Sequence, residues 1–313
     1  FQDRNWRPLF WTIMFVALSA SVVLAGVQKG IEKYTKILMP VLFVLIIILN
    51  IRSITLPGAK EGLEFLFRPD FSKIKASSII EALGQAFFSL SVGMGTLITY
   101  GSYINRKDNL ATSATAVAFT DTIIAILAGV AIFPAVFAFG INPASGPDLV
   151  FLTLPNIFAQ MAGGYFFAII FFFLLVVAAL TSTISILEVV VAYFSEELSM
   201  SRRKATFMAS LGIALLGILC SLSLNKVPEL SISGTHLFGI LEYVSANVLL
   251  PLGGFLIVVF VAWFFGKDKL KTELSSSSKF KIKYFGIYLF IIKYIAPLAI
   301  ALVFLNGLGI IKL

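Results

Sequence analysis

The sequence predicts an all-α integral membrane protein of about eight transmembrane helices, and three observations predict this fold class. The 313 residues are 59% hydrophobic, only 13% are charged, and the apolar residues gather into long runs. Soluble domains are typically about 45–50% apolar and about 25% charged, so a soluble core of this size has no room for this much apolar surface. Each run, of about 18 residues or more, is long enough to cross a hydrocarbon core of ~30 Å.

Eight such runs are present, and each predicts one membrane-spanning helix. Their expected bounds are residues 9–26, 37–56, 79–104, 112–140, 164–195, 205–223, 237–265 and 285–306. Lys and Arg gather in alternate loops, which the positive-inside pattern places in the cytoplasm: 28–36, 106–107, 202–204 and 267–283. The net charge of +8 follows from this topology, so no nucleic-acid partner is expected.

Two loops have a composition that predicts their form. Residues 141–163 are expected to be extracellular and contain three prolines around an apolar segment, 149–154, that is too short to span the bilayer. We expect a re-entrant or surface-packed lid there. Residues 274–279 include four consecutive serines and predict a flexible cytoplasmic linker.

The third run is interrupted in its middle by Ser89-Leu90-Ser91-Val92-Gly93-Met94-Gly95. Gly costs a helix interior about 1 kcal/mol relative to Ala, and lipid cannot satisfy an unwound backbone. An unwound turn at this depth predicts a cavity, where freed amides hold an anionic substrate group and freed carbonyls hold a cation. The alternative is that Gly93 and Gly95 form a small-residue packing face between helices.

The fifth run carries a hydroxyl cluster, Thr181-Ser182-Thr183, followed by Ser185. Ala178 and Ser182 are four residues apart and therefore share one face of the helix. The Ala178 carbonyl and these hydroxyls form an oxygen-only ligand set, which suits a hard cation such as sodium. The alternative is that the hydroxyls donate back to carbonyls of their own helix.

Asp121 and Glu188 lie well inside apolar runs, where a charge is costly and indicates function. Asp121 lies in the fourth run. If that helix begins close to it, Asp121 is instead an acid of the first turn, favoured by the helix dipole. Glu188 lies in the fifth run, about two turns after the hydroxyl cluster, and the sequence assigns it no role.

Several motifs together resemble the neurotransmitter:sodium symporter family, in particular its bacterial amino-acid transporters with the LeuT-type fold. They are Gly30-Ile31-Glu32-Lys33, Met39-Pro40, the stretch from Gly84-Gln85 through Gly95, Thr99-Tyr100-Gly101-Ser102-Tyr103, Ile132-Phe133-Pro134, Thr153-Leu154-Pro155, Leu180-Thr181-Ser182 and Glu196-Glu197-Leu198 with Ser201-Arg202. These motifs occur in the family's order and cover essentially the whole chain. The resemblance implies a five-plus-five inverted repeat in which the eight spans are family helices 4 to 11. The fold is then expected to be N-terminally truncated, without the first three helices, and this stretch alone is expected not to transport.

The resemblance also divides the chain. Residues 1–56 are expected to be the end of the first repeat, and residues 57–78 an extracellular loop. Residues 79–265 are expected to be the second inverted repeat, with its lid at 141–163. Residues 266–313 are then the cytoplasmic linker and the last helix.

The same resemblance implies a sodium-coupled symporter of a hydrophobic amino acid and assigns its site. Sodium is expected at Ser89, Asp121, Ala178, Thr181 and Ser182. The amino acid is expected against Phe88, Ser89, Ser91, Gly93, Met94, Ser182 and Ile186. Met94 stands where many family members have an aromatic residue, and its flexible side chain is suited to apolar substrates of differing shape.

Asp121 stands where the family usually has an asparagine, and Ala125 stands at the family's chloride-linked position. We expect Asp121 to supply a fixed negative charge, with Gln85 and Ser89 as neighbours, so that chloride is not required. Glu242 matches the family's acidic external gate, and Phe151 belongs to the lid.

Other function classes stay open at this stage, namely another cation-coupled solute transporter and an ion channel lined by the hydroxyls and Asp121. An enzyme is not expected, because the sequence has no zinc signature and no Gly-x-Ser-x-Gly elbow. The expected partners are a small-molecule amino acid and the lipid bilayer of the plasma membrane, which in bacteria is the inner membrane. The sequence predicts no oligomeric state.

Overall fold

The computed structural model describes residues 6–104, 109–140, 149–225, 231–232, 235–275 and 284–311. Seven helices within these residues are long and apolar enough to cross a membrane: Trp6–Leu24, Gly30–Ile54, Leu110–Ala138, Gly164–Glu196, Arg202–Ser223, Leu237–Phe264 and Phe285–Gly307. They confirm seven of the eight expected spans, with ends that are shifted by up to seven residues. The largest shift is at Gly30–Ile54, which begins within the expected loop 28–36. The eighth, 79–104, is divided into two shorter helices.

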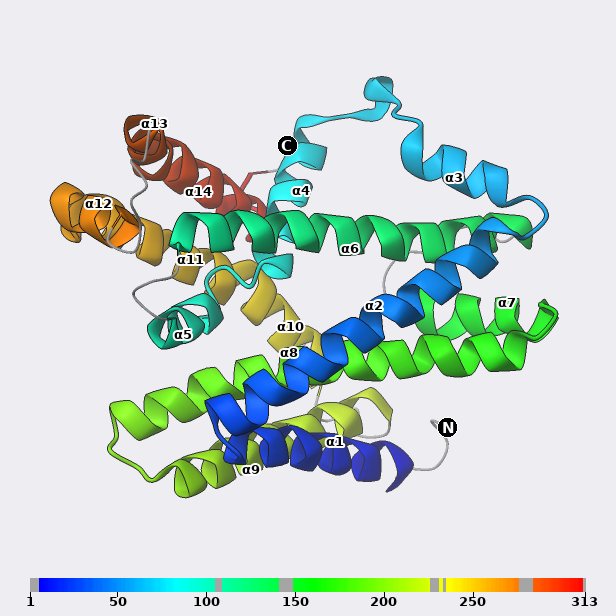
Figure 1. The fold of residues 1–313 in the computed structure, drawn as a ribbon, viewed down its shortest axis with the longest axis horizontal. Helices are drawn as coiled ribbons and strands as arrows, with labels where there is room; N and C mark the ends of the chain where they lie inside the picture. The colour runs from blue at the N-terminus through cyan, green and yellow to red at the C-terminus, as the bar shows by residue number, and fades with distance from the viewer. Residues whose placement is uncertain are drawn as a thin grey trace. The chain divides into compact units, whose positions relative to one another are not determined.

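Figure 1 follows the elements along the chain. In order they are α1 (Trp6–Leu24), η1 (Val27–Glu32), α2 (Lys33–Ile54), α3 (Ala59–Phe67), η2 (Phe71–Lys73), α4 (Ala76–Ser89), α5 (Thr96–Tyr103), α6 (Leu110–Ala138), η3 (Leu149–Thr153), α7 (Leu154–Gln160), α8 (Gly164–Glu196), α9 (Arg202–Asn225), β1 (Ser231–Ile232), β2 (Thr235–His236), α10 (Leu237–Tyr243), η5 (Val244–Leu249), α11 (Leu250–Val259), η6 (Phe260–Phe264), α12 (Lys267–Ser275), α13 (Phe285–Phe290), η7 (Ile291–Ile295) and α14 (Ala296–Gly307). Of the η elements, η2 is a 3-10 turn and the others are π-helical.

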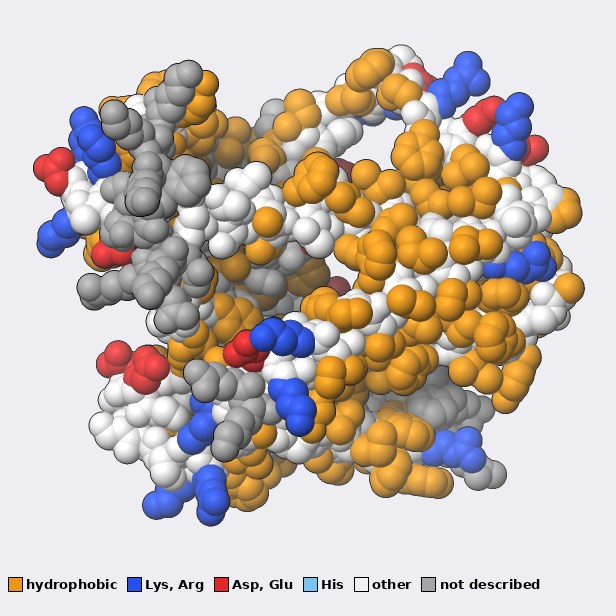
Figure 2. Space-filling model, viewed as in Figure 1, with side chains coloured by type: hydrophobic (Ala, Val, Ile, Leu, Met, Phe, Trp, Pro, Cys, Tyr) orange, Lys and Arg blue, Asp and Glu red, His pale blue; other side chains and the backbone are white. Residues whose placement is uncertain are grey.

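The chain forms two compact units. The first unit comprises Phe1–Leu24, Ile74–Ala118 and Ser185–Leu313, and the second comprises Ala25–Lys73 and Phe119–Ile184. Large apolar side chains on the membrane-spanning helices are widely exposed, as lipid-facing surfaces require, for example Phe43, Phe119 and Leu215. On the face shown in Figure 2, hydrophobic side chains predominate.

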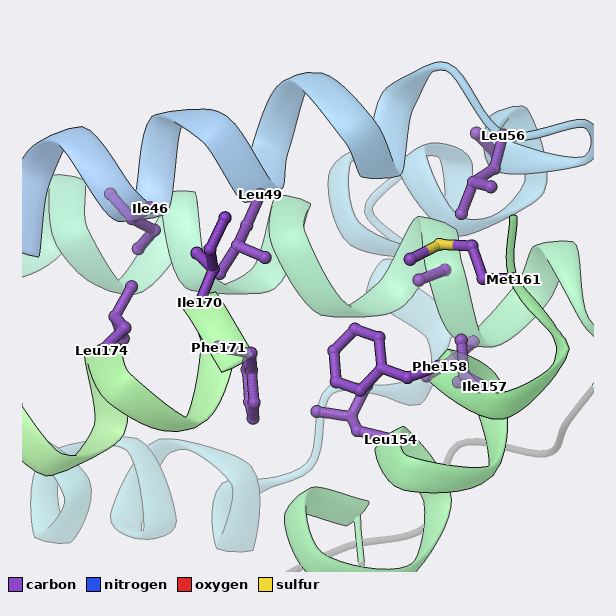
Figure 3. Close-up of a cluster of buried hydrophobic side chains, with 13 residues drawn as sticks. Ile46, Leu49, Leu56, Leu154, Ile157, Phe158, Met161, Ile170, Phe171 and Leu174 are labelled. Carbon is purple, nitrogen blue, oxygen red and sulfur yellow. The ribbon is translucent and has the colours of Figure 1, made fainter. Parts of the chain in front are cut away.

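The core of the second unit joins α2, α6, α7 and α8. Its buried members include Ile46 and Leu49 of α2, Val136 of α6, and Ile170 and Phe171 of α8. The short segment expected to be a lid contributes α7, whose Leu154, Ile157 and Phe158 point into this cluster (Figure 3). The segment is therefore packed against the unit's own helices; residues 141–148 of the expected lid lie outside the described residues.

Residues 57–78, expected to be an extracellular loop between two spans, contain the short helix α3 and the 3-10 turn η2. The helix α3 lies along the end of α6 in antiparallel sense. Gly58 meets Ala138, Gly62 meets Pro134 and Phe133, and the Leu66 side chain meets Gly129. A nine-residue helix is too short to produce a strong periodic signal, so its formation depends on this packing.

Two further loops contain regular structure that the sequence did not predict. Residues 231–232 and 235–236 pair as an antiparallel two-stranded ribbon, β1 and β2. Residues 267–275 form the helix α12, so the expected cytoplasmic linker is helical up to Ser275. Residues 276–283 and the basic pair Arg106 and Lys107 lie outside the described residues.

Candidate functional site

The break in the third expected span lies where the sequence predicts it. The helix α4 ends at Ser89 and α5 begins at Thr96, with a non-helical turn between them (Figure 1). Three residues of this turn have positive φ angles: Ser91 at 54°, Gly93 at 88° and Gly95 at 79°. Glycine adopts such angles without steric cost, whereas Ser91 must be held there by its surroundings. The interruption of the helix is therefore a defined backbone conformation that depends on these three φ angles.

The turn leaves two helix ends facing the interruption. The backbone N–H of Leu90 donates to the Ala86 carbonyl and that of Val92 to the Phe87 carbonyl, which closes the end of α4. Beyond these bonds, the C-terminal carbonyls of α4 carry partial negative charge and the N-terminal amides of α5 carry partial positive charge. Such a pair of ends can attract a cation on one side and a carboxylate on the other.

The residues predicted to contact substrate are divided between the two units. Phe88, Ser89, Ser91, Gly93 and Met94 lie together on the broken helix in the first unit. Phe88 and Ser89 are exposed, and the other three are half-buried. Gln85, one turn before Ser89, is also exposed on α4. Ser182 and Ile186 are one turn apart on α8 and both are exposed; Ser182 belongs to the second unit and Ile186 to the first.

The hydroxyl cluster of α8 shows the hydrogen bonding that was the alternative to ion binding. The Thr181 hydroxyl donates to the Ala178 carbonyl at 2.8 Å, and the Thr183 hydroxyl donates to the Ala179 carbonyl at 2.7 Å. The first of these bonds also brings the Ala178 and Thr181 oxygens of the predicted sodium ligands side by side. Ser182 follows directly and is exposed. The three predicted ligands of α8 therefore lie within one helical turn.

Asp121 lies well inside its helix. The helix α6 begins at Leu110 and has no acidic residue in its first turn. Eleven residues separate Leu110 from Asp121, which corresponds to about 16 Å along the axis. The interpretation of Asp121 as an acid of the first turn is therefore wrong, and its half-buried side chain lies in the interior of the helix. Ala125 follows one turn later.

The two residues assigned to the gate and the lid lie in different units. Glu242 is exposed on α10, two residues before the π-helical turn η5 begins at Val244. Phe151 lies in η3 with 63% of its surface exposed. Neither side chain is part of a buried cluster.

The structure gives Glu188 a set of partners that the sequence did not reveal. Its carboxylate is fully buried and forms an ion pair with Arg202, at 2.6 Å between Oε2 and Nη2. The Tyr103 hydroxyl at the end of α5 donates to the same carboxylate at 2.9 Å. One turn earlier on α8, Ser185 accepts a hydrogen bond from the Tyr100 hydroxyl at 2.8 Å. Two tyrosines therefore tie α5 to α8.

Arg202 also reaches α1. Its Nε and Nη2 donate to the Val23 carbonyl at 3.0 and 2.8 Å, while Nη1 and Nη2 donate to Glu188. One guanidinium thus joins the end of α1, the last third of α8 and the start of α9. Its fixed fork of donors suits this task, and a charged carboxylate without such partners would be costly to bury. The signal in the sequence was a glutamate within an apolar run; the identity of its partner required the fold.

Comparison with known proteins places these features in a family. The model of the Sodium:neurotransmitter symporter family matches residues 6–312. The sodium-dependent transporter YhdH of Bacillus subtilis, described as uncharacterized, is 40% identical over 300 residues, and a sodium-dependent transporter of Haemophilus influenzae, likewise described, is 44% identical over 307. These matches cover 96% and 98% of the chain, which spans 66% of the length of each relative.

A solved structure is similar to this chain in both fold and sequence. The crystal structure of MhsT in complex with L-phenylalanine has a TM-score of 0.86 to this chain and 44% sequence identity, covering 98% of this chain and 70% of that one. MhsT has the LeuT-type fold, so the fold expected from the motifs is confirmed. The helix break, the apolar spans and the family model are consistent with one another. The chain belongs to the sodium:neurotransmitter symporter family.

Proposed function

We propose that this protein carries a hydrophobic amino acid across the plasma membrane together with sodium, by alternating access. The observation that carries the proposal is the turn at residues 90–95, where positive φ angles at Ser91, Gly93 and Gly95 interrupt a membrane helix. Lipid cannot satisfy such a backbone, so the turn is tolerated only where it is packed against protein or lines a polar cavity, and a site for an ion and a carboxylate would provide partners for its free polar groups. Family membership supports transport as the purpose of that site.

The substrate class rests on side chains near the turn and on one relative. Phe88, Met94 and Ile186 are apolar, and the structure of MhsT holds L-phenylalanine. We assign the amino-acid contacts to Phe88, Ser89, Ser91, Gly93, Met94, Ser182 and Ile186. The carboxylate of the substrate is favoured near the amide end of α5, and the Met94 thioether tolerates side chains of different shape.

Sodium is the coupling ion of the proposal and a second substrate. Ser89 and Asp121 are assigned to one ion, and Ala178, Thr181 and Ser182 to another. Sodium near the carboxylate raises the affinity for the amino acid, and by linkage the amino acid raises the affinity for sodium. Glu242 is assigned to an outer gate, and Phe151 to the lid that closes over the substrate.

The deciding experiment is uptake of labelled L-phenylalanine by the protein at its full native length, reconstituted into proteoliposomes. With an inward sodium gradient, we expect saturable accumulation above equilibrium that is abolished when potassium or choline replaces sodium. Equal accumulation in potassium would contradict sodium coupling. Linear, non-saturable flux of sodium without accumulation would instead support the channel alternative, and accumulation of other solutes in place of amino acids would support a different cation-coupled transporter.

A further inference from the structure

The unwound turn of the broken helix packs backbone to backbone against a glycine pair on α11. A Cβ atom built on Gly253 would lie 2.7 Å from the Gly93 carbonyl oxygen. In the opposite direction, a Cβ on Gly93 would collide with the Leu250 carbonyl oxygen and lie 2.9 Å from the Gly254 amide nitrogen. Real Cβ atoms essentially never approach so closely, so these positions accept only glycine without movement. The contact lies wholly within the first unit.

Gly254 extends the same contact. A Cβ there would lie 3.0 Å from the ring edge of Phe87, with Val92 also close. Gly254 and Pro251 are buried. Here the neighbouring atoms belong to side chains, which can yield, whereas the neighbour of Gly253 is backbone. The two glycines therefore differ in how strictly they are required.

The helix that carries the glycine pair is itself irregular. The π-helical turn η5 precedes α11, and Pro251 at its start has no backbone N–H to continue a regular helix. The Leu250 N–H donates to the Ser245 carbonyl, five residues back. A π-helical turn shifts the helix face that follows it, and such turns are frequent at functional sites. In this chain, the helix face that follows η5 places Leu250 and Gly253 against the backbone of Gly93.

We propose that Gly253 and Gly254 are positioning residues for substrate recognition. They allow α11 to approach the backbone at Gly93 and thereby set where Ser91 and Met94 lie. The inference rests on the proposed function, because Ser91 and Met94 are assigned there to the substrate. Neither glycine contacts the substrate in this proposal; both act through the backbone of the turn.

The test compares Gly253→Ala with Gly254→Ala and with two control variants. Gly212 on α9 and Gly286 on α13 are also glycines within membrane helices, and a Cβ at either meets no described atom within 4 Å. In Gly253→Ala, the Cβ and the Gly93 oxygen must move apart by roughly 0.7 Å, from 2.7 Å to an ordinary contact of 3.4 Å. Displacements of about this size in binding groups can cost up to about 100-fold in rate.

The readouts are the KM for phenylalanine, the KM for leucine, and the maximal uptake rate normalised to the amount of folded protein in the proteoliposomes. We expect Gly253→Ala to raise the phenylalanine KM at least about fivefold and to change the phenylalanine-to-leucine KM ratio at least about threefold. Gly254→Ala should have a smaller effect in the same direction, since the Phe87 ring can move. The variants Gly212→Ala and Gly286→Ala should keep the wild-type ratio.

If a variant no longer transports, its ligand binding is measured in place of uptake. Binding is then followed by the rise in melting temperature that phenylalanine and sodium produce in purified protein, and Gly254→Ala serves if Gly253→Ala cannot be purified. An unchanged KM ratio and an unchanged ligand-induced shift would overturn the inference, even if total activity fell. If the wild-type protein itself shows no sodium-dependent uptake or binding, the proposed function fails instead, so the two failures are distinct.

Discussion

The fully buried Glu188 carboxylate on α8 and the half-buried Arg202 guanidinium at the start of α9 form a bidentate ion pair. The same guanidinium holds the Val23 carbonyl, and the Tyr103 hydroxyl completes the carboxylate's partners. A buried ion pair is strongly destabilising when one partner is removed, because the other charge is left uncompensated. The cluster therefore makes the first unit sensitive to single substitutions.

Arg202→Ala should lower the free energy of unfolding by about 3–5 kcal/mol, because the Glu188 carboxylate loses its counter-charge and the Val23 carbonyl loses its hydrogen-bond donor. Glu188→Gln should cost less, since the amide still accepts hydrogen bonds. The matched control is Arg203→Ala, whose side chain is exposed at the same helix start. Thermal unfolding in detergent measures all three, and an Arg202→Ala melting temperature equal to that of the control would argue against the ion pair's importance.

Thr181→Val and Ser182→Ala should each raise the sodium concentration for half-maximal uptake roughly tenfold or more, about 1.4 kcal/mol of binding. The reason is the loss of an oxygen from the proposed ligand set on α8. Thr183→Val is the control, because the Thr183 hydroxyl donates to Ala179 and lies outside that set. If the three variants shift the sodium dependence equally, the assignment of the site to Ala178, Thr181 and Ser182 is wrong.

Wild-type uptake should be indifferent to replacement of chloride by gluconate, because Asp121 is proposed to supply the fixed negative charge. Asp121→Asn keeps the shape of the side chain and removes that charge. Uptake in chloride-free medium should then fall at least about tenfold, corresponding to about 1.4 kcal/mol. Measuring the uptake of both proteins at several chloride concentrations tests whether Asp121 takes the place of chloride. Strict chloride dependence of the wild-type protein would contradict this role of Asp121.

Gly62→Ala should destabilise the second unit by about 1–3 kcal/mol through overpacking. A Cβ on Gly62 would lie 2.5 Å from the Pro134 Cα atom and 2.6 Å from the Phe133 carbonyl oxygen, both backbone atoms that cannot easily yield. Gly84→Ala is a suitable control, because its Cβ would meet only the Val303 side chain at an ordinary 3.6 Å. Equal melting temperatures for the two variants would show that α3 can separate from α6 without cost.

Much of the fold could be predicted because the bilayer imposes strong rules on sequence. Each span needs an apolar run of a minimum length, so the seven long helices of the described residues lie close to their expected bounds. The interruption at residues 90–95 was predictable because two glycines and two serines are costly in the middle of such a run. Short helices outside this rule, α3 and α12, were not predictable, since their formation depends on packing or on local contacts.

The site was predicted by residue type and by resemblance, and its contacts were not. The sequence shows that Asp121 and Glu188 lie within apolar runs, but only the start of α6 at Leu110 decides that Asp121 lies far from a helix end. It shows glycines in two spans without indicating that Gly93 meets Gly253, 160 positions later. Periodicity within one helix carries no information about which distant helix faces it.

By itself, the sequence determined a multi-span membrane protein with one broken helix and a hydroxyl cluster, because hydrophobic length and helix-breaking residues are local properties of the chain. Only the tertiary structure decided which contacts hold those elements together. Arg202 binds Glu188 and the Val23 carbonyl, and the glycines of α11 pack against the unwound turn. These contacts depend on sub-ångström packing between segments far apart in the chain, which no local pattern encodes.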